Sequence, residues 1–259
     1  MAMQPEDLLL FAADAARLML ESGGETYRAE DTAMDIIACQ GGAEAECFAT
    51  STGLMLSYTG EDGKVRSVVR RVKRRGMNLE KASRIHAMVD NLRGDRIGIM
   101  EAASELDAIE RLRERPAAVR MGASALGAGL FTLLFGGGAA EAAAAAVIGA
   151  LLSLLILGFQ RLRLPEFLAS LAGGALTALA SLYLQSLGIT ASPDAIIIGV
   201  IMLLVPGVAI TNAIRDIIAG DLVAGIARGV DAFITAAAIS AGAGGAFAMW
   251  KLFEHGGLR

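Results

Sequence analysis

The charged residues of this 259-residue chain are distributed very unevenly. Residues 1–115 hold 16 of the 23 lysines and arginines and 20 of the 27 aspartates and glutamates, so residues 116–259 hold only seven of each sign. A water-soluble domain needs a charged outer surface, and so few charged side chains cannot supply one. The second part of the chain therefore predicts a membrane-embedded domain whose solvent is lipid.

Residues 1–115 have an ordinary soluble composition and predict an N-terminal cytosolic α+β domain. Two helices at the start, three short strand-like stretches and two further helices give the order ααβββαα. The first helix begins in an acidic turn after Pro5 and stops at Gly23 and Gly24. The first residues lack the basic start and apolar run of a signal peptide, which favours a domain that stays in the cytosol.

Residues 116–259 predict an all-α bundle of about five transmembrane helices. The apolar stretches cover 117–135, 139–159, 167–187, 196–210 and 222–250. The first three and the last are long enough to cross about 30 Å of hydrocarbon. The fourth reaches that length only if its helix continues past Pro206, because proline removes a helix hydrogen bond.

Arginines near the ends of these stretches predict the orientation. They precede the first stretch, lie between the second and third, and flank the connection after the fourth, whereas 136–140 and 188–195 carry none. The pattern predicts a multi-pass protein of the bacterial inner (cell) membrane with a cytosolic N-terminus and a periplasmic C-terminus.

Small residues pervade the apolar stretches and predict close helix packing. Gly225 and Gly229 form a small-xxx-small step, and further glycines recur along the spans. These are Gly122, Gly127, Gly129, Gly173, Gly174, Gly242, Gly244 and Gly245.

The richest polar segment of the membrane part follows Pro206 and is a candidate transport site. A helix interrupted at membrane depth exposes backbone groups that can line a substrate cavity. Asn212 and Asp216 share one helical face, and Arg228 can pair with Asp216 or with Asp231. The alternative is a proline kink and a cytosolic loop whose polar residues only cap helices. The candidate residues are Pro206, Gly207, Thr211, Asn212, Asp216, Arg228 and Asp231.

Two polar features of the N-terminal domain also have alternative explanations. Glu21, Glu25, Arg28 and Glu30 form either a solvated corner between helices or a functional cluster. The basic run 70–75 is either a solvated edge that discourages strand pairing or a contact with anionic lipid.

No catalytic residues, metal site or cofactor are predicted, because the chain shows no nucleophile with a base, no metal cluster and no nucleotide-binding loop. Cys39 and Cys47 lack zinc-like spacing and are expected to be buried thiols. The net charge of −4 gives no basic signature for nucleic acid.

Three runs in order resemble the threonine/serine exporter (ThrE) family. The first is RLMLESGGETYRAED at 17–31, and the second is RGMNL at 75–79. The third begins at Val205-Pro206-Gly207 and continues through Asn212-Ala213, Asp216, Gly220, Gly225 and Ala227-Arg228.

The resemblance implies a non-enzymatic, proton-coupled secondary exporter of small polar metabolites, either threonine and serine or dicarboxylates such as succinate. The chain corresponds to one half of the single-chain members, so it is similar to the YjjP-like large subunit of a two-component exporter. Such a subunit needs a small YjjB-like membrane partner. The alternative is a membrane-anchored cytosolic enzyme or regulatory domain.

Overall fold

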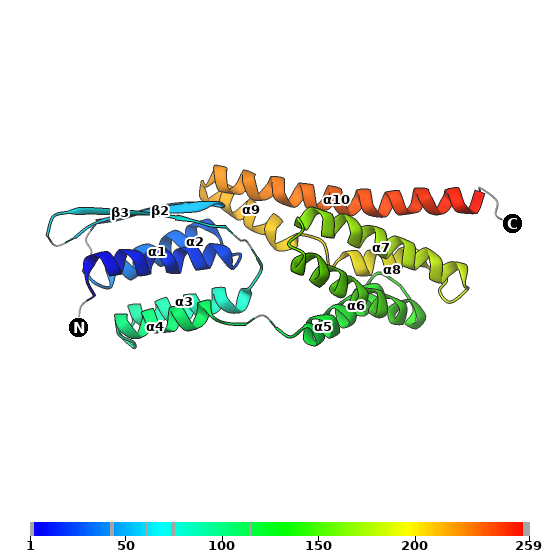
Figure 1. Ribbon diagram of the computed structural model, residues 1–259, viewed down its shortest axis with the longest axis horizontal. Helices are drawn as coiled ribbons and strands as arrows, with labels where there is room; N and C mark the ends of the chain where they lie inside the picture. Colours follow the sequence, from blue (N-terminus) through cyan, green and yellow to red (C-terminus); the bar gives the residue numbers. More distant parts are fainter. Residues whose placement is uncertain (1–2, 42–43, 61, 74–75, 114, 256–259) are drawn as a thin grey trace. The chain divides into compact units, whose positions relative to one another are not determined.

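The structure is a computed structural model that describes residues 3–41, 44–60, 62–73, 76–113 and 115–255 (Figure 1). Its contacts divide the chain into two compact units. The first comprises residues 1–113 and 208–230, and the second comprises 114–207 and 231–259. Residues 208–230, which the sequence placed in the membrane domain of 116–259, therefore cluster with the N-terminal domain.

The first unit contains helices α1 to α4, a three-stranded sheet, α9 and the start of α10. Its helices are α1 (Pro5–Glu21), α2 (Thr26–Ala38), α3 (Leu79–Arg93), α4 (Ile99–Glu110) and α9 (Gly207–Ala219). The strands β1 (Glu44–Thr50), β2 (Gly53–Thr59) and β3 (Val65–Arg71) pair antiparallel in the order β1-β2-β3. The predicted α+β content and the element order of residues 1–113 are confirmed.

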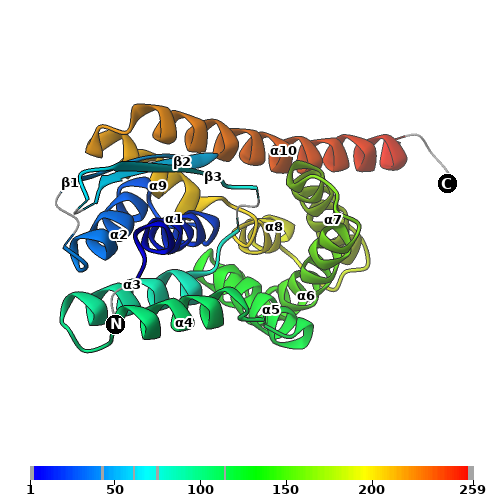
Figure 2. The same cartoon turned by 60° about the vertical axis from the view of Figure 1, so that its left-hand side comes forward.

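Helix α1 forms the centre of this unit because one side of it is almost entirely apolar. Its buried residues pack with those of α2 and with one face of the sheet, and Figure 2 shows the strands lying over these helices. The helix ends in a Schellman motif: Gly23, at φ +87°, donates to the Leu20 carbonyl, and Gly24 donates to the Met19 carbonyl. The sequence predicted that the first helix ends at this pair of glycines, and the prediction is confirmed.

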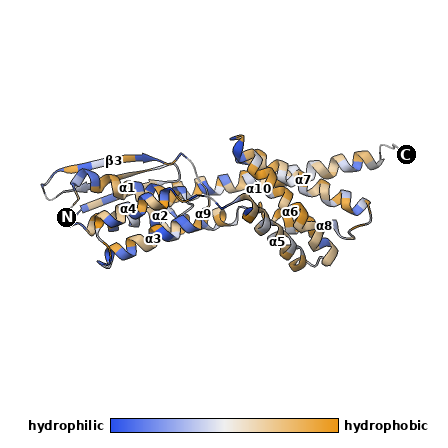
Figure 3. Ribbon diagram, turned by 60° about the horizontal axis from the view of Figure 1, so that its bottom comes forward, coloured by the Kyte–Doolittle hydropathy of each residue, from blue (hydrophilic) through white to orange (hydrophobic). Residues whose placement is uncertain are grey.

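The second unit is a helical bundle of α5 (Ala117–Leu134), α6 (Ala139–Arg161), α7 (Glu166–Ser186), α8 (Pro193–Ile201) and most of α10 (Leu222–His255). Figure 3 shows these helices mainly in the hydrophobic colours, whereas α1 to α4 carry many hydrophilic stretches. Within the described residues, α5, α6, α7 and α10 are long and apolar enough to cross a membrane.

The fourth predicted stretch, 196–210, is not a continuous helix. Helix α8 ends at Ile201, turns occupy 202–204, and α9 begins at Gly207. Pro206 has no N–H and its ring clashes with the preceding turn of a helix, so a break at this place is expected. Helix α8 nevertheless lies in the core of the second unit, where Ile196 and Val200 pack against Ile148 and Leu152 of α6.

Only some of the predicted packing glycines allow a close approach. A Cβ on Gly174 would meet the Ile239 carbonyl, and one on Gly242 would meet the Leu171 carbonyl, so α7 and α10 touch through their backbones. A Cβ on Gly122, Gly244 or Gly245 would meet no atom within 4 Å, so the close packing expected of these three is not present within the described structure.

Candidate functional site

Two candidate clusters that the sequence places far apart meet inside the first unit. The inner face of α9 lies against the turn between α1 and α2. The side-chain amide of Asn212 donates to the Gly23 carbonyl at 2.9 Å. Asp216 accepts from the Thr26 backbone N–H through Oδ1 and from the Thr26 hydroxyl through Oδ2, each at 3.2 Å. Asn212 and Asp216 thus share one face, as their spacing predicted.

Arg228, at the start of α10, completes this contact. Its Nε lies 3.1 Å from Oδ2 of Asp216. Its Nη2 donates to the Gly24 carbonyl at 2.9 Å and to the Thr26 hydroxyl at 3.3 Å. The Asp216 side chain is fully buried and that of Arg228 is 12% exposed, so the pair is shielded from water. We call the contacts of Asn212, Asp216 and Arg228 with residues 23–26 the clasp.

The clasp places a carboxylate at the amino end of α2, where it is electrostatically favoured. Thr26 is the first residue of α2, and Glu25 before it makes no side-chain cap of its own. The free backbone N–H groups and the helix dipole at this end stabilise negative charge. Asp216 on α9 therefore caps the amino end of α2. This agrees with the alternative explanation that the polar residues after Pro206 cap helices.

Glu25 forms the outer edge of the clasp. Its carboxylate accepts from Arg215 at 2.6 Å and from Arg28 at 3.0 Å. The side chain of Glu25 is nearly buried, whereas those of both arginines are about half exposed. The two arginines thus compensate a carboxylate that has left most of its water.

The three sequence runs that carry the family resemblance converge on the turn between α1 and α2. Residues 21–26 of the first run form the turn, and the third run supplies the clasp. The second run is held there as well, because the Gly76 N–H donates to the Glu21 carbonyl and the Asn78 N–H donates to the Ser22 carbonyl, both at 3.0 Å. Arg75 lies outside the described residues. Runs that are separate in sequence therefore build one place in the fold.

Carboxylates beside the clasp lie in an environment that favours their protonated forms. Glu30 accepts from the Ala49 N–H at 2.7 Å, but burial raises its pKa, and the negative charges of Asp221, Asp31 and Asp216 act in the same direction. Burial, followed by the charge of Asp216, also raises the pKa of Asp221. This side of the first unit thus gathers more negative charge than it compensates locally.

The remaining candidate residues lie outside the clasp. Glu21 pairs with Arg17 at 2.9 Å on α1. Pro206 and Gly207 lie at the break before α9, and Thr211 is on the exposed side of that helix. Asp231 belongs to the second unit, where its carbonyl accepts from the Thr235 hydroxyl at 3.0 Å.

The sequence prediction missed Gly23, Gly24 and Thr26 as partners, because two of them act through backbone carbonyls. It also left out Arg215, whose position beside Asp216 gave a weak signal.

The basic run 70–75 is only partly a surface feature. Arg70 pairs with Asp14 of α1 at 2.9 Å, whereas Arg71 and Lys73 are exposed. Arg74 and Arg75 lie outside the described residues. Strand β3 is an edge of the sheet, as the first explanation of this run requires.

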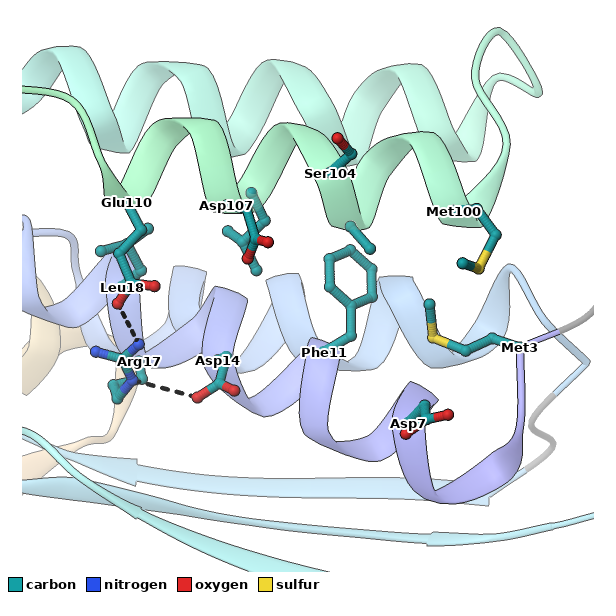
Figure 4. A pocket seen from close by; sticks show the side chains of 12 residues that line it. Met3, Asp7, Phe11, Asp14, Arg17, Leu18, Met100, Ser104, Asp107 and Glu110 are labelled. Atoms are coloured by element: carbon teal, nitrogen blue, oxygen red, sulfur yellow. Dashed lines mark hydrogen bonds and ion pairs between the residues drawn. The ribbon is translucent and has the colours of Figure 1, made fainter.

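Two further features of the first unit are its cysteines and a surface groove. Both thiols are half-buried, and burial raises the pKa of Cys47 to about 12. A groove of about 410 Å³ between α1 and α4 is lined by Phe11, Leu18 and Arg17 and by Asp14 and Glu110, which both pair with Arg17 (Figure 4). In the part of the chain that the structure describes, no group of three or more His, Cys, Asp or Glu could hold a metal ion.

Comparison with known proteins supplies the family. The family model described as "Putative threonine/serine exporter" (ThrE) matches residues 10–250, which include both contact units almost entirely. Neither the curated proteins nor the solved structures gave a match.

Proposed function

Because the chain belongs to the threonine/serine exporter family, we propose that it is a subunit of a secondary active exporter that moves small polar metabolites out of the cytosol. The convergence of the three family-like runs on residues 21–26 carries this proposal, since it ties the N-terminal domain to the helices that follow the break at Pro206. A domain that the transmembrane helices merely anchored to the membrane would not need a buried polar contact such as the clasp.

The break between α8 and α9 is the proposed place of substrate contact. Helix α8 lies in the core of a bundle of candidate spans, and residues 202–206 interrupt the regular helix directly after it. Backbone groups freed at such a break can bind the polar groups of a substrate. In this proposal Pro206, Gly207 and Thr211 contact substrate, and Asn212, Asp216 and Arg228 hold α9 in place.

The substrates that we propose are threonine and serine or dicarboxylates such as succinate, and the driving force is the proton gradient. We also propose that a small YjjB-like membrane subunit supplies the second half of the pathway, since transporter sites lie at the interface of two repeats.

Efflux from whole cells tests this proposal. Cells that express the chain alone, the partner alone or both are loaded with threonine, serine and succinate, and the release of each is measured. We expect release only from cells with both proteins, and a collapse of release when a protonophore is added. Equal release from all three strains would contradict the exporter function.

The second candidate function is a membrane-anchored cytosolic enzyme or regulator, which the polar cluster at Glu21, Glu25, Arg28 and Glu30 would support. All three of these carboxylates bind arginines or a backbone N–H group, which favours a structural role for them. An enzyme or regulator would retain its effect on cells in a Pro206→Ala variant that no longer exports.

A further inference from the structure

Helix α9 has its polarity reversed relative to a helix on the surface of a soluble domain. Its polar residues Asn212 and Asp216 are buried against the turn between α1 and α2. Its outer side carries Ile214 and Ile218, which are 53% and 80% exposed. A soluble amphipathic helix turns its apolar face inward, so the opposite arrangement needs an apolar medium outside.

The beginning of α10 extends this apolar surface. Gly225 lies against α9 so closely that a Cβ would be 2.5 Å from Cγ1 of Ile217, and the two helices form a tight hairpin. The exposed side chains of this part of α10 are again aliphatic, namely Leu222, Val223, Ile226 and Val230. Together with Val208, Ile210, Ile214, Ile217 and Ile218 of α9 they form a surface that we call the aliphatic face.

Three ionic groups of the hairpin are paired, and the fourth, Asp221, lies in the turn between α9 and α10. Asp216 and Arg228 bind each other, and Arg215 binds Glu25. The residues of the aliphatic face include no aromatic side chain. Thr211 lies on the same side of α9, one turn before Ile214 and toward the break at Pro206, and the half-exposed Arg215 lies beside the face. Protein interfaces concentrate their binding energy in aromatic residues and arginine, so its composition fits lipid better than a protein partner.

The length of α10 gives a second, independent argument. Its 34 residues correspond to about 51 Å of helix, whereas the hydrocarbon of a bilayer is about 30 Å thick. The candidate span Leu222–Phe253 begins with residues of the aliphatic face, so that face is continuous along the helix with a segment that meets hydrocarbon. The excess length of α10 can lie in the headgroup region.

We infer that the aliphatic face is immersed in the boundary between headgroups and acyl chains, and that α9 and the start of α10 thereby dock the N-terminal unit on the bilayer. The clasp is then the polar inner side of a membrane-bound hairpin. Helices that lie in this boundary present a polar side to water or protein and bury the apolar side about 5–10 Å deep. Lipid at this face is independent of which metabolite the protein exports.

Depth-dependent quenching tests this inference in the full chain reconstituted into lipid vesicles. Cys39→Ser and Cys47→Ala remove the native thiols, and Ile218→Cys carries an environment-sensitive fluorophore. Leu154→Cys, on the exposed side of the candidate span α6, is the control for deep lipid. Ser83→Cys, exposed on α3, is the control for water.

We expect lipids brominated near the headgroup to quench the label at position 218 about twofold or more. Lipids brominated deep in the acyl chains should quench the label at 154 most strongly, and neither kind should quench the label at 83. Water-like emission at 218 without quenching would overturn the inference. Blue-shifted emission at 218 without quenching would also overturn it, because the face would then be covered by protein, such as the bundle, a second copy or a partner subunit.

Ile214→Cys provides a second probe on the same face. If the label at 218 disturbs the hairpin, the less exposed position 214 should still show shallow quenching. The absence of quenching at both positions in a protein that retains its α-helical content would exclude the bilayer as the occupant.

Discussion

Asp216 and Arg228 form a buried ion pair, with 3.1 Å between Oδ2 and Nε, across the turn that joins α9 to α10. Neither residue relies on the other alone, because Thr26 donates twice to Asp216 and the Gly24 carbonyl accepts from Arg228. A buried pair is stable only when further hydrogen bonds satisfy its remaining atoms, and the turn between α1 and α2 provides them.

We expect Arg228→Met to destabilise the protein strongly, by about 3–5 kcal/mol, because it leaves the Asp216 carboxylate buried without a cation. The measurement is the temperature at which the detergent-solubilised protein loses its monodisperse chromatographic peak. Arg215→Met is the matched control. It removes a half-exposed arginine whose partner Glu25 keeps Arg28, and it should cost at most about 1 kcal/mol.

If Asp216 lined a substrate cavity, as one explanation of the sequence holds, Asp216→Asn would abolish export at a normal protein level. With Asp216 fully buried at the amino end of α2, we expect the amount of folded protein to fall instead. An Asp216→Asn protein that is as heat-stable as the wild type and yet inactive would instead place Asp216 in the transport site.

Asn212 and Thr211 are neighbours on α9 with different surroundings, which allows a second paired test. Asn212→Ala removes the hydrogen bond to the partly buried Gly23 carbonyl, at a cost of about 1 kcal/mol. Thr211 lies on the exposed side of the helix, so Thr211→Ala should leave stability nearly unchanged. Thr211→Ala should instead lower export per molecule if this residue contacts substrate. Unchanged export in Thr211→Ala would remove it from the proposed site.

Gly242 and Gly244 are two residues apart on α10 and have different surroundings, which allows a third paired test. Gly242→Ala should reduce the amount of folded protein in the membrane, because its Cβ would collide with the Leu171 backbone of α7. Gly244→Ala should have no such effect, because no atom lies within 4 Å of its Cβ position. Quantitative immunoblots of membranes compare the two. Equal yields would mean that α7 and α10 do not touch at Gly242.

Glu30 predicts how stability depends on pH. Its pKa is raised above the unfolded value, chiefly by burial, so folding favours the protonated carboxyl. This stabilising effect is complete below the unfolded pKa and is lost as the pH rises through the raised pKa.

Glu30→Gln can keep the bond from the Ala49 N–H and carries no charge. We therefore expect the variant to melt at a higher temperature than the wild type at pH 8, and the difference to vanish at pH 4. Circular dichroism follows both melts, and a variant that melts lower at pH 8 would mean that the Glu30 carboxylate stabilises the fold in its charged form.

The sequence predicted the elements of the N-terminal domain well because their signals are local. The Gly23-Gly24 stop and the alternation in the strands each depend on neighbouring residues. The clasp could not be predicted in the same way, since Asp216 meets Thr26 across 190 residues of sequence. The apolar outer side of α9 gave no sign of this contact either, because an apolar helix predicts a membrane domain even when its inner side packs on the N-terminal domain.

The same contacts lead to a prediction about topology. We propose that the N-terminal domain is cytosolic, as the distribution of arginines predicts. The candidate spans α5, α6 and α7 would then carry the chain to the periplasm at residues 187–192. The clasp holds α9 on the N-terminal domain, which requires α9 to be on the cytosolic side. Residues 193–206 must then cross, although as a helix they would reach only about 21 Å, which is short of about 30 Å of hydrocarbon. Such a short crossing requires the loop before α8 to dip below the periplasmic surface. Helix α10 then crosses once more.

We expect reporters fused after Ile189 and after Arg259 to behave as periplasmic and one fused after Ala219 to behave as cytosolic. A periplasmic signal at Ala219 would mean that α8 returns without crossing, and the clasp could not form in the membrane. A cytosolic signal at Arg259 together with a cytosolic one at Ala219 would mean that α10 does not span.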